Sequence, residues 1–379
     1  MKIGLDIQST LKNKTGVGWY TQNIIENLAD NELEFEGYAF NFLGRNNIHK
    51  SISTLNFDVK INKILPYSLY RRIWSYLPIP YNHLVNSQAD IFHFFNYILP
   101  PKIRGKVIVT VYDMVYKLFP ETMTKKNYRW LEKGLQRSIN RADKIITISK
   151  SAKKDIMKYL AIDEEKIEII YPGIDHELYS SELKVGKVKE LREKYNIPKN
   201  FILYLGTLEP RKNIGRIIDA YAKYQQQAKD DISLVLAGKK GWMYQEIFDK
   251  VKEHSLEDKV VFTGYVNEID KPAIYKMSKL FIFPSLYEGF GMPVLEAMAS
   301  ATPVITSNIS SLPEVVGDAA LLVDPYDISD ISSVIKRILE DKKLQLRMIE
   351  QGLKQSAKFS WQKSAEKLLT VYKEAGGYE

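Results

Sequence analysis

The feature that most constrains the fold is a recurring run of β-branched and other apolar residues, each followed by a helix-length segment. In the first half these runs are residues 2–7, 107–111, 144–148 and 167–171; in the second half they are 201–205, 233–237, 260–263, 280–283, 303–306 and 320–323. Near-continuous apolar strands that alternate with helices are typical of parallel sheets covered by helices on both faces. The pattern predicts an α/β fold.

The chain has 379 residues, which is too long for one ordinary hydrophobic core, so two domains are expected. After residues 171–179 the chain becomes charged and weakly apolar up to residue 200. We therefore predict an N-terminal domain of residues 1–185 and a C-terminal domain of residues 186–360, each with a Rossmann-like parallel sheet. Ligands of such sheets bind beyond the carboxyl ends of strands, so chemistry is expected in a cleft between the two sheets.

Composition excludes several classes of protein. A hydrophobic fraction of 45% with 26% charged residues is typical of a soluble globular protein. The absence of cysteine rules out disulfides, thiolate metal sites and a cysteine nucleophile. No signal-peptide region opens the chain, and the longest apolar stretches, such as residues 91–101, are shorter than the about 20 residues of a membrane helix. We expect a cytoplasmic protein.

The net charge of +8 is concentrated in one part of the chain. Residues 117–158 contain twelve Lys or Arg and four Asp or Glu. Such a surface could meet nucleic acid, an anionic membrane or a phosphorylated substrate, or it could be a solvated helical face. Nearby, residues 69–77 mix aromatic side chains with Arg71 and Arg72, as interfacial segments do, although a partly buried helix has the same pattern. The aromatic residues do not interleave with the basic run in the pattern of a recognised RNA or DNA module, so no nucleic acid is expected.

Two glutamates mark the most informative segment, residues 283–297. Glu288 and Glu296 are separated by seven residues, and Gly289 and Gly291 lie between them. A strand is expected to end near residue 283, and a helix to begin near Pro293. Glycines let backbone amides approach a ligand, and a helix start attracts anions. The spacing favours one carboxylate beside a reacting sugar and one that binds hydroxyl groups; the alternative is that Glu296 only lies on the helix surface.

A second cluster, residues 205–213, also lies between a strand and a helix. Gly206 permits a tight turn, and Arg211 and Lys212 place two cations at a helix N-terminus. Cations there oppose the helix dipole unless an anion binds between them. This misfit favours a diphosphate ligand, whereas two merely exposed basic residues are the structural alternative.

Three N-terminal features are weaker candidates. Gly16 and Gly18 form a Gly-x-Gly turn ahead of a helix, which can bind phosphate but is also an ordinary tight turn. Asp113 follows a buried strand and either faces the cleft or caps a turn. His93 lies among aromatic residues, where a lone histidine is more often a core residue than a ligand.

Metal ligands are not evident in the sequence. No Asp-x-Asp motif occurs, and the five histidines form no cluster with metal-ligand spacing. We therefore expect no metal and no cofactor, and expect Arg211, Lys212 and helix N-termini to neutralise a leaving diphosphate.

Together these segments resemble glycosyltransferase family 4, whose members are retaining enzymes of the GT-B fold. The resemblance spans essentially the whole chain and rests on Gly16–Gly18, the segment 206–213, the Glu288-x7-Glu296 signature and the closing Phe359-Ser-Trp361 helix. The Glu-Pro-Arg-Lys-Asn form is similar to bacterial mannosyltransferases and rhamnosyltransferases of surface-polysaccharide assembly. Many relatives have His-Asp where this chain has Tyr112-Asp113, so a histidine contact to the acceptor is not implied there.

The resemblance implies a role for each matching residue. Arg211 and Lys212 would bind the donor diphosphate, Glu288 would lie beside the transferred sugar, and Glu296 would hold the ribose. The implied donor contacts further include Gly16, Gly18, Gly206, Gly289, Phe290 and Gly291. Asp113, with His93 as a further candidate, would position the acceptor. The helix of residues 361–379 would pack back on the N-terminal, acceptor-binding domain.

The implied activity is transfer of a hexose, with mannose or rhamnose favoured, from a nucleoside-diphosphate sugar to a saccharide or lipid-linked acceptor. Two mechanisms stay open: same-face attack with the leaving phosphate accepting the proton, and double displacement through Glu288. Contact with the inner face of an anionic plasma membrane is expected from the basic run. A nucleotide-sugar epimerase of the same architecture is the alternative enzyme, and a nucleic-acid-binding protein the alternative of another class.

Overall fold

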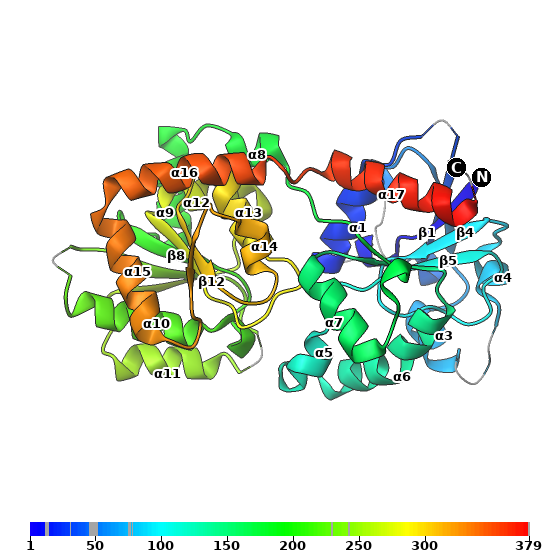
Figure 1. The fold of residues 1–379 in the computed structure, drawn as a ribbon, viewed down its shortest axis with the longest axis horizontal. Coiled ribbons are helices and arrows are strands. Elements are labelled where there is room, and N and C mark those ends of the chain that lie inside the picture. Colours follow the sequence, from blue (N-terminus) through cyan, green and yellow to red (C-terminus); the bar gives the residue numbers. More distant parts are fainter. Residues whose placement is uncertain are drawn as a thin grey trace. The chain divides into compact units, whose positions relative to one another are not determined.

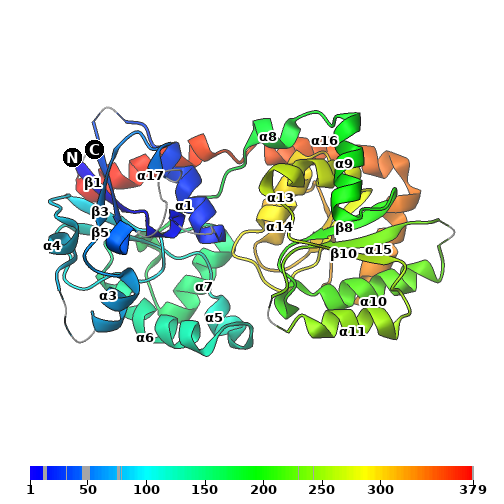
Figure 2. The ribbon, with the colours of Figure 1, turned by 180° about the vertical axis from the view of Figure 1, so that it is seen from behind.

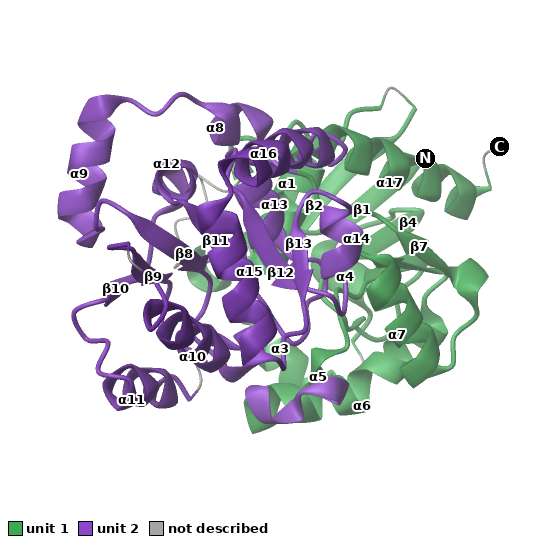
Figure 3. Ribbon diagram, turned by 60° about the vertical axis from the view of Figure 1, so that its left-hand side comes forward, with its two compact units in different colours: residues 1–116, 124–173, 361–379 green, residues 117–123, 174–360 purple. Residues whose placement is uncertain are grey.

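The computed structural model describes residues 1–11, 15–30, 32–44, 52–74, 77, 79–228, 230–241 and 243–377. The chain forms two compact units, coloured green and purple in Figure 3. Unit 1 comprises Met1–Tyr116, Thr124–Gly173 and Trp361–Glu379, and unit 2 comprises Lys117–Met123 and Ile174–Ser360. Within the described ranges, no helix is both long and apolar enough to cross a membrane.

Unit 1 is built on a parallel sheet of seven strands in the order β3-β2-β1-β4-β5-β6-β7. Its strands are β1 (Lys2–Asp6), β2 (Glu34–Phe40), β3 (Asp58–Asn62), β4 (Ile91–Phe94), β5 (Lys106–Thr110), β6 (Lys144–Thr147) and β7 (Ile167–Ile169). Its helices are α1 (Gly16–Glu26), α3 (Tyr67–Ile73), α4 (Tyr81–Val85), α6 (Lys125–Arg141), α7 (Lys150–Leu160) and α17 (Trp361–Gly376). Helix α5 (Val115–Leu118) begins in unit 1 and ends in the segment assigned to unit 2. Helices α1 and α17 lie on one face of the sheet, and α3 and α6 on the other (Figure 1).

Unit 2 repeats this plan with a parallel sheet of six strands in the order β10-β9-β8-β11-β12-β13. The strands are β8 (Phe201–Leu205), β9 (Ser233–Ala237), β10 (Val260–Gly264), β11 (Leu280–Phe283), β12 (Val304–Ser307) and β13 (Leu321–Val323). The helices, seen from behind in Figure 2, are α8 (His176–Ser180), α9 (Val185–Tyr195), α10 (Ile214–Gln225), α11 (Gln245–Glu253), α12 (Lys271–Met277), α13 (Met292–Ala299), α14 (Leu312–Val316), α15 (Ile328–Glu340) and α16 (Lys342–Ser356). Strands β8 and β11 are buried along their whole length, as expected for a sheet with two covered faces.

The units divide earlier than the boundary expected at residues 185/186. Helix α8 contacts α12 and α13, and these contacts assign the residues after Gly173 to unit 2. Helix α17 groups with unit 1, where it contacts α1 and β4. Trp361 packs edge-on against Tyr20 with ring centroids 5.7 Å apart, so the apolar stripe of this helix is buried within unit 1.

Each sheet has a point where the strand order changes direction. In unit 1 the chain runs outward from β1 to β2 and β3, then returns to place β4 on the other side of β1. In unit 2 the same reversal lies between β8 and β11. The crevice beyond the carboxyl ends of such a strand pair is where open α/β sheets bind ligands. Asp6 ends β1, and the segments 206–213 and 284–291 follow β8 and β11.

Candidate active site

Two segments far apart in sequence are joined at the carboxyl ends of β8 and β11. The Leu286 N–H donates to Arg211 O at 2.9 Å. The Asn213 backbone is in the left-handed conformation at φ 63°. Its side-chain Nδ2 donates to Pro284 O at 3.0 Å and to Pro325 O at 2.6 Å. The turn of residues 210–212 is therefore tied by main-chain and amide bonds to the glycine-rich turn after β11, which brings their charged side chains together.

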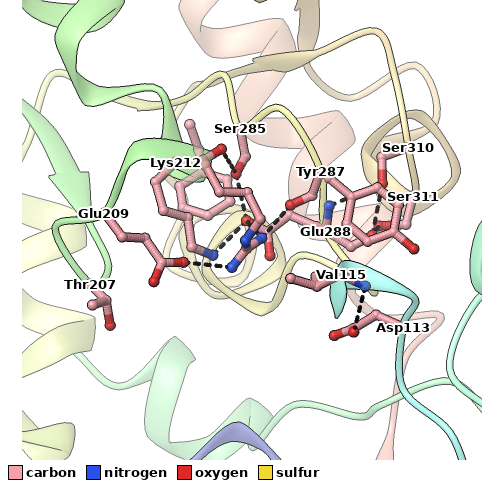
Figure 4. Close-up of polar contacts among 12 residues, drawn as sticks. Asp113, Val115, Thr207, Glu209, Lys212, Ser285, Tyr287, Glu288, Ser310 and Ser311 are labelled. Carbon is pink, nitrogen blue, oxygen red and sulfur yellow. Dashed lines mark hydrogen bonds and ion pairs between the residues drawn. The ribbon is translucent and has the colours of Figure 1, made fainter. Parts of the chain in front are cut away.

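The charged side chains form one ion-pair cluster around Glu288 (Figure 4). Lys212 Nζ lies 2.5 Å from Glu288 Oε1, and Arg211 Nη1 lies 3.3 Å from the same oxygen. Arg211 Nη2 also pairs with Glu209 Oε1 at 2.7 Å, and Arg211 Nη1 donates to Tyr287 O. Ser285 Oγ donates to Glu288 Oε1 at 2.6 Å. One carboxylate oxygen thus binds two cations and a hydroxyl.

Burial and charge act on the pKa of Glu288 in opposite directions. Burial raises the pKa, but the charges of Lys212 and Arg211, with hydrogen bonds from Lys212 and Ser285, lower it by more, to about 2. The pKa of Lys212 is lowered, by burial first and then by the neighbouring Arg211, although Glu288 opposes this shift. Glu288 is therefore an anion at neutral pH and not a general acid.

These pairs correct the electrostatic argument made for Arg211 and Lys212. Both residues lie in a short 3-10 turn, Pro210–Lys212, ahead of α10 rather than inside its first turn. Both also have carboxylate partners within unit 2, so their charges are not left unbalanced in the free protein. A diphosphate at this point would share or displace the Glu288 contacts.

Two serines that the sequence did not single out hold the main chain of Glu288. Ser310 Oγ accepts from Glu288 N at 3.0 Å and lies 2.8 Å from Glu288 O. Ser311 Oγ lies 2.9 Å from Glu288 O and 2.8 Å from Phe290 O. Ser310 adopts a left-handed conformation at φ 62°, which is uncommon for a residue with a side chain. The loop after β12 therefore fixes the position of Glu288.

Gly291 is required where it lies. It precedes α13 at φ 110°, and a Cβ there would come 2.7 Å from the Leu312 side chain. Pro293 occupies the first turn of α13, as the sequence predicted. The Phe290 side chain is buried against Phe359, with ring centroids 5.5 Å apart. Gly289 lies in the turn directly before Phe290. The N-terminus of α13 thus starts directly beyond the Glu288 cluster.

Gly206 marks a close approach between two loops. A Cβ on it would lie 2.9 Å from the Tyr204 hydroxyl. Opposite it, Gly238 has φ +151°, and a Cβ at that position would lie 1.8 Å from Gly206 O. Gly238, at the end of β9, was not a sequence candidate; its only signal was an isolated glycine at a strand end.

Glu296 is buried, which rules out a role as a helix-surface residue. It lies within α13, where its Oε2 accepts from the Tyr275 hydroxyl at 3.0 Å and its Oε1 is 3.9 Å from Lys271 Nζ. These partners come from α12 and differ from those of Glu288. The two glutamates therefore occupy different electrostatic environments, as the spacing predicted.

The N-terminal candidates have different surroundings in unit 1. Gly16 and Gly18 lie in the first turn of α1 rather than in a turn ahead of it, because the helix already begins at Gly16. Neither has a positive φ, and a Cβ on Gly16 would meet nothing within 4 Å. Lys14, which precedes this segment, lies outside the described residues. Asp113 Oδ1 accepts from Val115 N at 3.1 Å at the start of α5 (Figure 4).

His93 does not line a ligand site. It is completely buried in β4, with Nδ1 2.7 Å from the Tyr372 hydroxyl of α17 and Nε2 2.8 Å from the Thr110 hydroxyl of β5. Burial lowers its pKa to about 3, so the ring is neutral. The prediction of an acceptor contact at His93 is wrong, because both ring nitrogens bind core hydroxyls.

Metal ligands are not gathered anywhere in the described part of the chain. No group of three or more His, Asp or Glu side chains with the geometry of a metal site occurs there. The positive charge available at the site comes from Arg211 and Lys212.

Family models match both units of the chain. Residues 14–178 match the model described as Glycosyltransferase Family 4, and residues 187–355 match the model described as Glycosyl transferases group 1. O-antigen chain mannosyltransferase B of Escherichia coli is 32% identical over 75% of this chain and 74% of its own length. The serotype-specific mannosyltransferase WbdA of Escherichia coli is 34% identical over 69% of this chain, but the match spans only 33% of that protein.

Solved structures show the same fold. Anabaena Alr3699/HepE, solved in complex with UDP and glucose, superposes with a TM-score of 0.73 at 18% identity over 99% of this chain and 100% of that one. WaaG, a glycosyltransferase involved in lipopolysaccharide biosynthesis, gives a TM-score of 0.73 at 17% identity over 97% of this chain and 99% of its own. The two parallel-sheet units are thus those of the GT-B fold.

Proposed function

The chain belongs to glycosyltransferase family 4, and from this we propose that it transfers mannose, with retention and without a metal ion or other cofactor, from a nucleoside-diphosphate sugar to a saccharide or lipid-linked saccharide. The two relatives named above are mannosyltransferases, and one of them is an O-antigen chain mannosyltransferase, which supports mannose and surface-polysaccharide assembly. The Glu-Pro-Arg-Lys-Asn segment at residues 209–213 adds the resemblance to bacterial mannosyltransferases noted from the sequence.

The observation that carries the proposal is the buried Arg211–Lys212–Glu288 cluster at the β8/β11 reversal. Two cations fixed by short contacts can stabilise the charge that develops on a leaving diphosphate, and they need not reorganise during the reaction. The glycine-rich turn at residues 289–291 and the start of α13 add main-chain N–H groups beside the same point. These groups would bind phosphates or the donor sugar.

Glu288 and Glu296 would bind different parts of the donor. Glu288, an anion whose pKa is held at about 2, would stabilise positive charge at the anomeric carbon. Glu296 lies in a polar environment with Tyr275 and Lys271, where its carboxylate can accept hydrogen bonds from ribose hydroxyls. In unit 1, Gly16 and Gly18 remain proposed donor contacts, and Asp113 a proposed acceptor contact.

The surroundings of Glu288 favour same-face attack over double displacement. Its Oε1 is held by two cations and the Ser285 hydroxyl, and its low pKa makes it a weak nucleophile. In same-face attack, the bond from the anomeric carbon to the diphosphate oxygen breaks while the bond to the acceptor oxygen forms on that face. The leaving phosphate takes the acceptor's proton, so atoms and charge balance without an enzyme base.

A basic surface of unit 1 supports peripheral contact with an anionic membrane, such as the inner face of the plasma membrane. On α6, Lys125, Lys126, Arg129, Lys133 and Arg137 are exposed and make no ion pair within the described residues. Each basic residue near such a surface contributes about 1 kcal/mol. In the segment 69–77, the Arg71 guanidinium carbon lies 3.9 Å from the centre of the Trp130 ring. Trp74 is buried, whereas Leu69 and Arg72 are exposed. Residues 75–76 lie outside the described ranges.

The test is a donor screen followed by product analysis. Nucleoside-diphosphate sugars that carry mannose, rhamnose, glucose or N-acetylglucosamine are compared by thermal shift, since a bound ligand raises the melting temperature of the protein. The selected donor is then incubated with and without mannoside acceptors. Acceptor-dependent glycoside formation supports the proposal, whereas conversion of the donor without an acceptor would identify an epimerase.

A further inference from the structure

Besides the Glu288 cluster of unit 2, the structure has a polar group in unit 1, at the point where the strand order of its sheet changes direction. Asp6 is the last residue of β1, and Phe94 of the neighbouring strand β4 lies opposite it in register. This is the pair of strands at which the sheet order reverses, so Asp6 occupies the position where open α/β sheets bind ligands. None of the donor-binding roles proposed above uses Asp6.

The Asp6 carboxylate has unused hydrogen-bonding capacity. Its Oδ1 accepts from Gln8 N at 2.9 Å, and its Oδ2 accepts no hydrogen bond from the part of the chain that the structure describes. Burial raises the pKa of Asp6 to about 6, although the Gln8 N–H and the charge of Arg71 oppose the shift. At neutral pH Asp6 is therefore an anion, and its Oδ2 has no hydrogen-bond donor among the described residues.

Tyrosine side chains from α3 and α4 pack at the end of the sheet where Asp6 lies. Burial raises the pKa values of Tyr67, Tyr70 and Tyr81, and the charge of Asp6 raises all three further. Tyr70 and Tyr81 both pack against Phe40, with ring centroids 5.5 and 6.3 Å away. Tyr81 also packs edge-on against Phe94 at 5.0 Å, directly beside Asp6 in the sheet.

The hydroxyls of Tyr70 and Tyr81 have no partner. Both residues are at least 99% buried, and neither hydroxyl makes a hydrogen bond among the described residues. Trp130 Nε1, on the ring beneath the Arg71 guanidinium, is also buried and finds no partner in the part of the chain that the structure describes. Buried polar groups almost always have hydrogen-bond partners, so orphaned groups at the end of the sheet where Asp6 lies indicate a site whose ligand supplies them.

We propose that Asp6, Tyr70 and Tyr81 bind hydroxyl groups of the saccharide acceptor, with the Arg71–Trp130 pair beside them. This proposal rests on the proposed transferase function. It gives the acceptor a binding site in unit 1, whereas the donor is bound by the Glu288 cluster of unit 2. Carboxylates accept, and tyrosine hydroxyls donate or accept, the hydrogen bonds that sugar hydroxyls make. Aromatic walls with a few polar groups are typical of small-molecule sites. Asp6 would repel a phosphate, which favours a neutral sugar.

Tyr70→Phe and Tyr81→Phe test the orphaned hydroxyls. Removing a buried hydroxyl that has no internal partner should leave the melting temperature unchanged or raise it. Loss of one hydrogen bond to the acceptor should raise its KM by roughly 3–10-fold, with donor KM and kcat nearly unchanged. Octyl α-mannobioside is the acceptor probe. A lower melting temperature, or an unchanged acceptor KM, would overturn the assignment.

Asp6→Asn tests the carboxylate, with Asp90→Asn as the matched control. Asp90 also accepts a hydrogen bond from a backbone N–H, that of Lys2 at 2.7 Å. However, Asp90 directly precedes β4 and so lies at the amino ends of the strands, whereas Asp6 lies at a carboxyl end. We expect at least a tenfold rise in acceptor KM for Asp6→Asn, no change for Asp90→Asn, and the same nucleotide-induced thermal shift in both. Equal acceptor KM values in the two variants would contradict the proposal.

Saturation-transfer NMR with octyl α-mannobioside separates this inference from the proposed function. Signal from the wild-type protein that is lost in Asp6→Asn supports the site even where no donor is turned over, in which case only the transferase assignment fails. Turnover by the wild type with an unaltered probe signal in Asp6→Asn removes the site and leaves the function standing. No probe signal from the wild type overturns the site.

Discussion

Glu288 neutralises the charge of two neighbouring cations and is also proposed to stabilise the anomeric carbon during transfer. In the free protein its carboxylate is the shared partner of Lys212 and Arg211, two cations that a diphosphate would also bind. The side chains of Glu288 and Lys212 are only 10% and 12% exposed, so each depends on the other for compensation. Removing the Glu288 charge therefore affects catalysis, nucleotide binding and stability in distinguishable ways.

Glu288→Gln is expected to lower kcat by about 10²–10³-fold, because a fixed negative charge beside the anomeric carbon acts mainly in the transition state. Nucleoside diphosphate should bind more tightly, since the anion that competes for Lys212 is gone. Glu296→Gln should instead raise donor KM with a smaller loss of kcat, because a ribose hydroxyl is held alike in ground and transition states. Initial rates and calorimetric titration measure both. Normal turnover by Glu288→Gln with weakened nucleotide binding would reverse the assigned roles.

The depressed pKa of Glu288 predicts a specific pH dependence of stability. Because the pKa falls from 4.5 to about 2 on folding, its stabilisation is fully present above pH 4.5 and is lost as the pH falls toward 2. Glu288→Gln should flatten the fall in unfolding free energy over this range, and at neutral pH should destabilise the protein by about 3 kcal/mol. Denaturant titrations at a series of pH values measure this.

Glu350→Gln is the control for that series. Glu350 pairs with Lys354 at 2.5 Å on the surface of α16, where an exposed pair contributes little. Its stability profile should follow the wild type throughout. A Glu288→Gln profile that also follows the wild type would mean that the ion-pair cluster does not stabilise the fold.

Residue types and strand ends were enough to single out Glu288 and Glu296 in one segment, and Arg211 and Lys212 in another. The direct contact between Lys212 and Glu288 was not predictable, because it depends on how two loops 76 residues apart meet. The serines at 310 and 311 gave no signal, since serine is common in any loop. His93 was proposed despite an aromatic environment that already favoured the core.

At the scale of elements, α13 depends on a glycine that α1 does not need. Gly291→Ala is strained at φ 110° and meets Leu312, so it should cost about 1–3 kcal/mol and shift the amides before α13, raising donor KM. Gly16→Ala, in open space at a helical φ, should be tolerated or stabilise α1 by about 0.5–1 kcal/mol. Melting temperatures and donor KM values measure both. Equal effects on stability would contradict this account of the two glycines.

Every apolar run predicted as a strand overlaps an observed strand, but β2, β3 and β4 were not among the predicted strands. Strand β2 carries Glu34, Glu36 and Gly37, which interrupt its apolar pattern. Glu36 is nevertheless buried, because Lys60 and Lys2 on the flanking strands approach it to 2.6 and 3.4 Å. A buried carboxylate compensated from neighbouring strands is a tertiary property that a single segment does not reveal.

At the scale of the whole molecule, the number of sheets followed from chain length and the recurring strand pattern, whereas the return of α17 to the first unit was implied by the family resemblance. The boundary did not follow from either, because α8 is short and its assignment depends on contacts with α12 and α13. Surface charge was predictable in amount, whereas Arg71 proved to be engaged with Trp130. Long-range packing, rather than local pattern, explains each difference.

Membrane contact is tested by reversing three charges on α6. With Lys125, Lys126 and Arg129 changed to Glu, binding to anionic vesicles should fall by about two orders of magnitude, since each basic residue contributes about 1 kcal/mol. The control changes Lys342, Lys343 and Arg347 on α16, which are also exposed. Flotation at low and high salt measures binding. Recovery with neutral vesicles equal to that with anionic ones, or equal loss in both variants, would remove the membrane proposal.

The most direct test of the central claim is NMR analysis of the product formed in excess EDTA from an α-linked nucleoside-diphosphate mannose and a mannoside acceptor. The one-bond carbon–proton coupling of the new anomeric centre reports its configuration. The account predicts an acceptor-dependent α-mannoside, formed at the same rate with and without the chelator, because Arg211 and Lys212 supply the charge that a metal would otherwise provide. A β-linked product, or transfer that stops in EDTA and returns with magnesium or manganese, would contradict it.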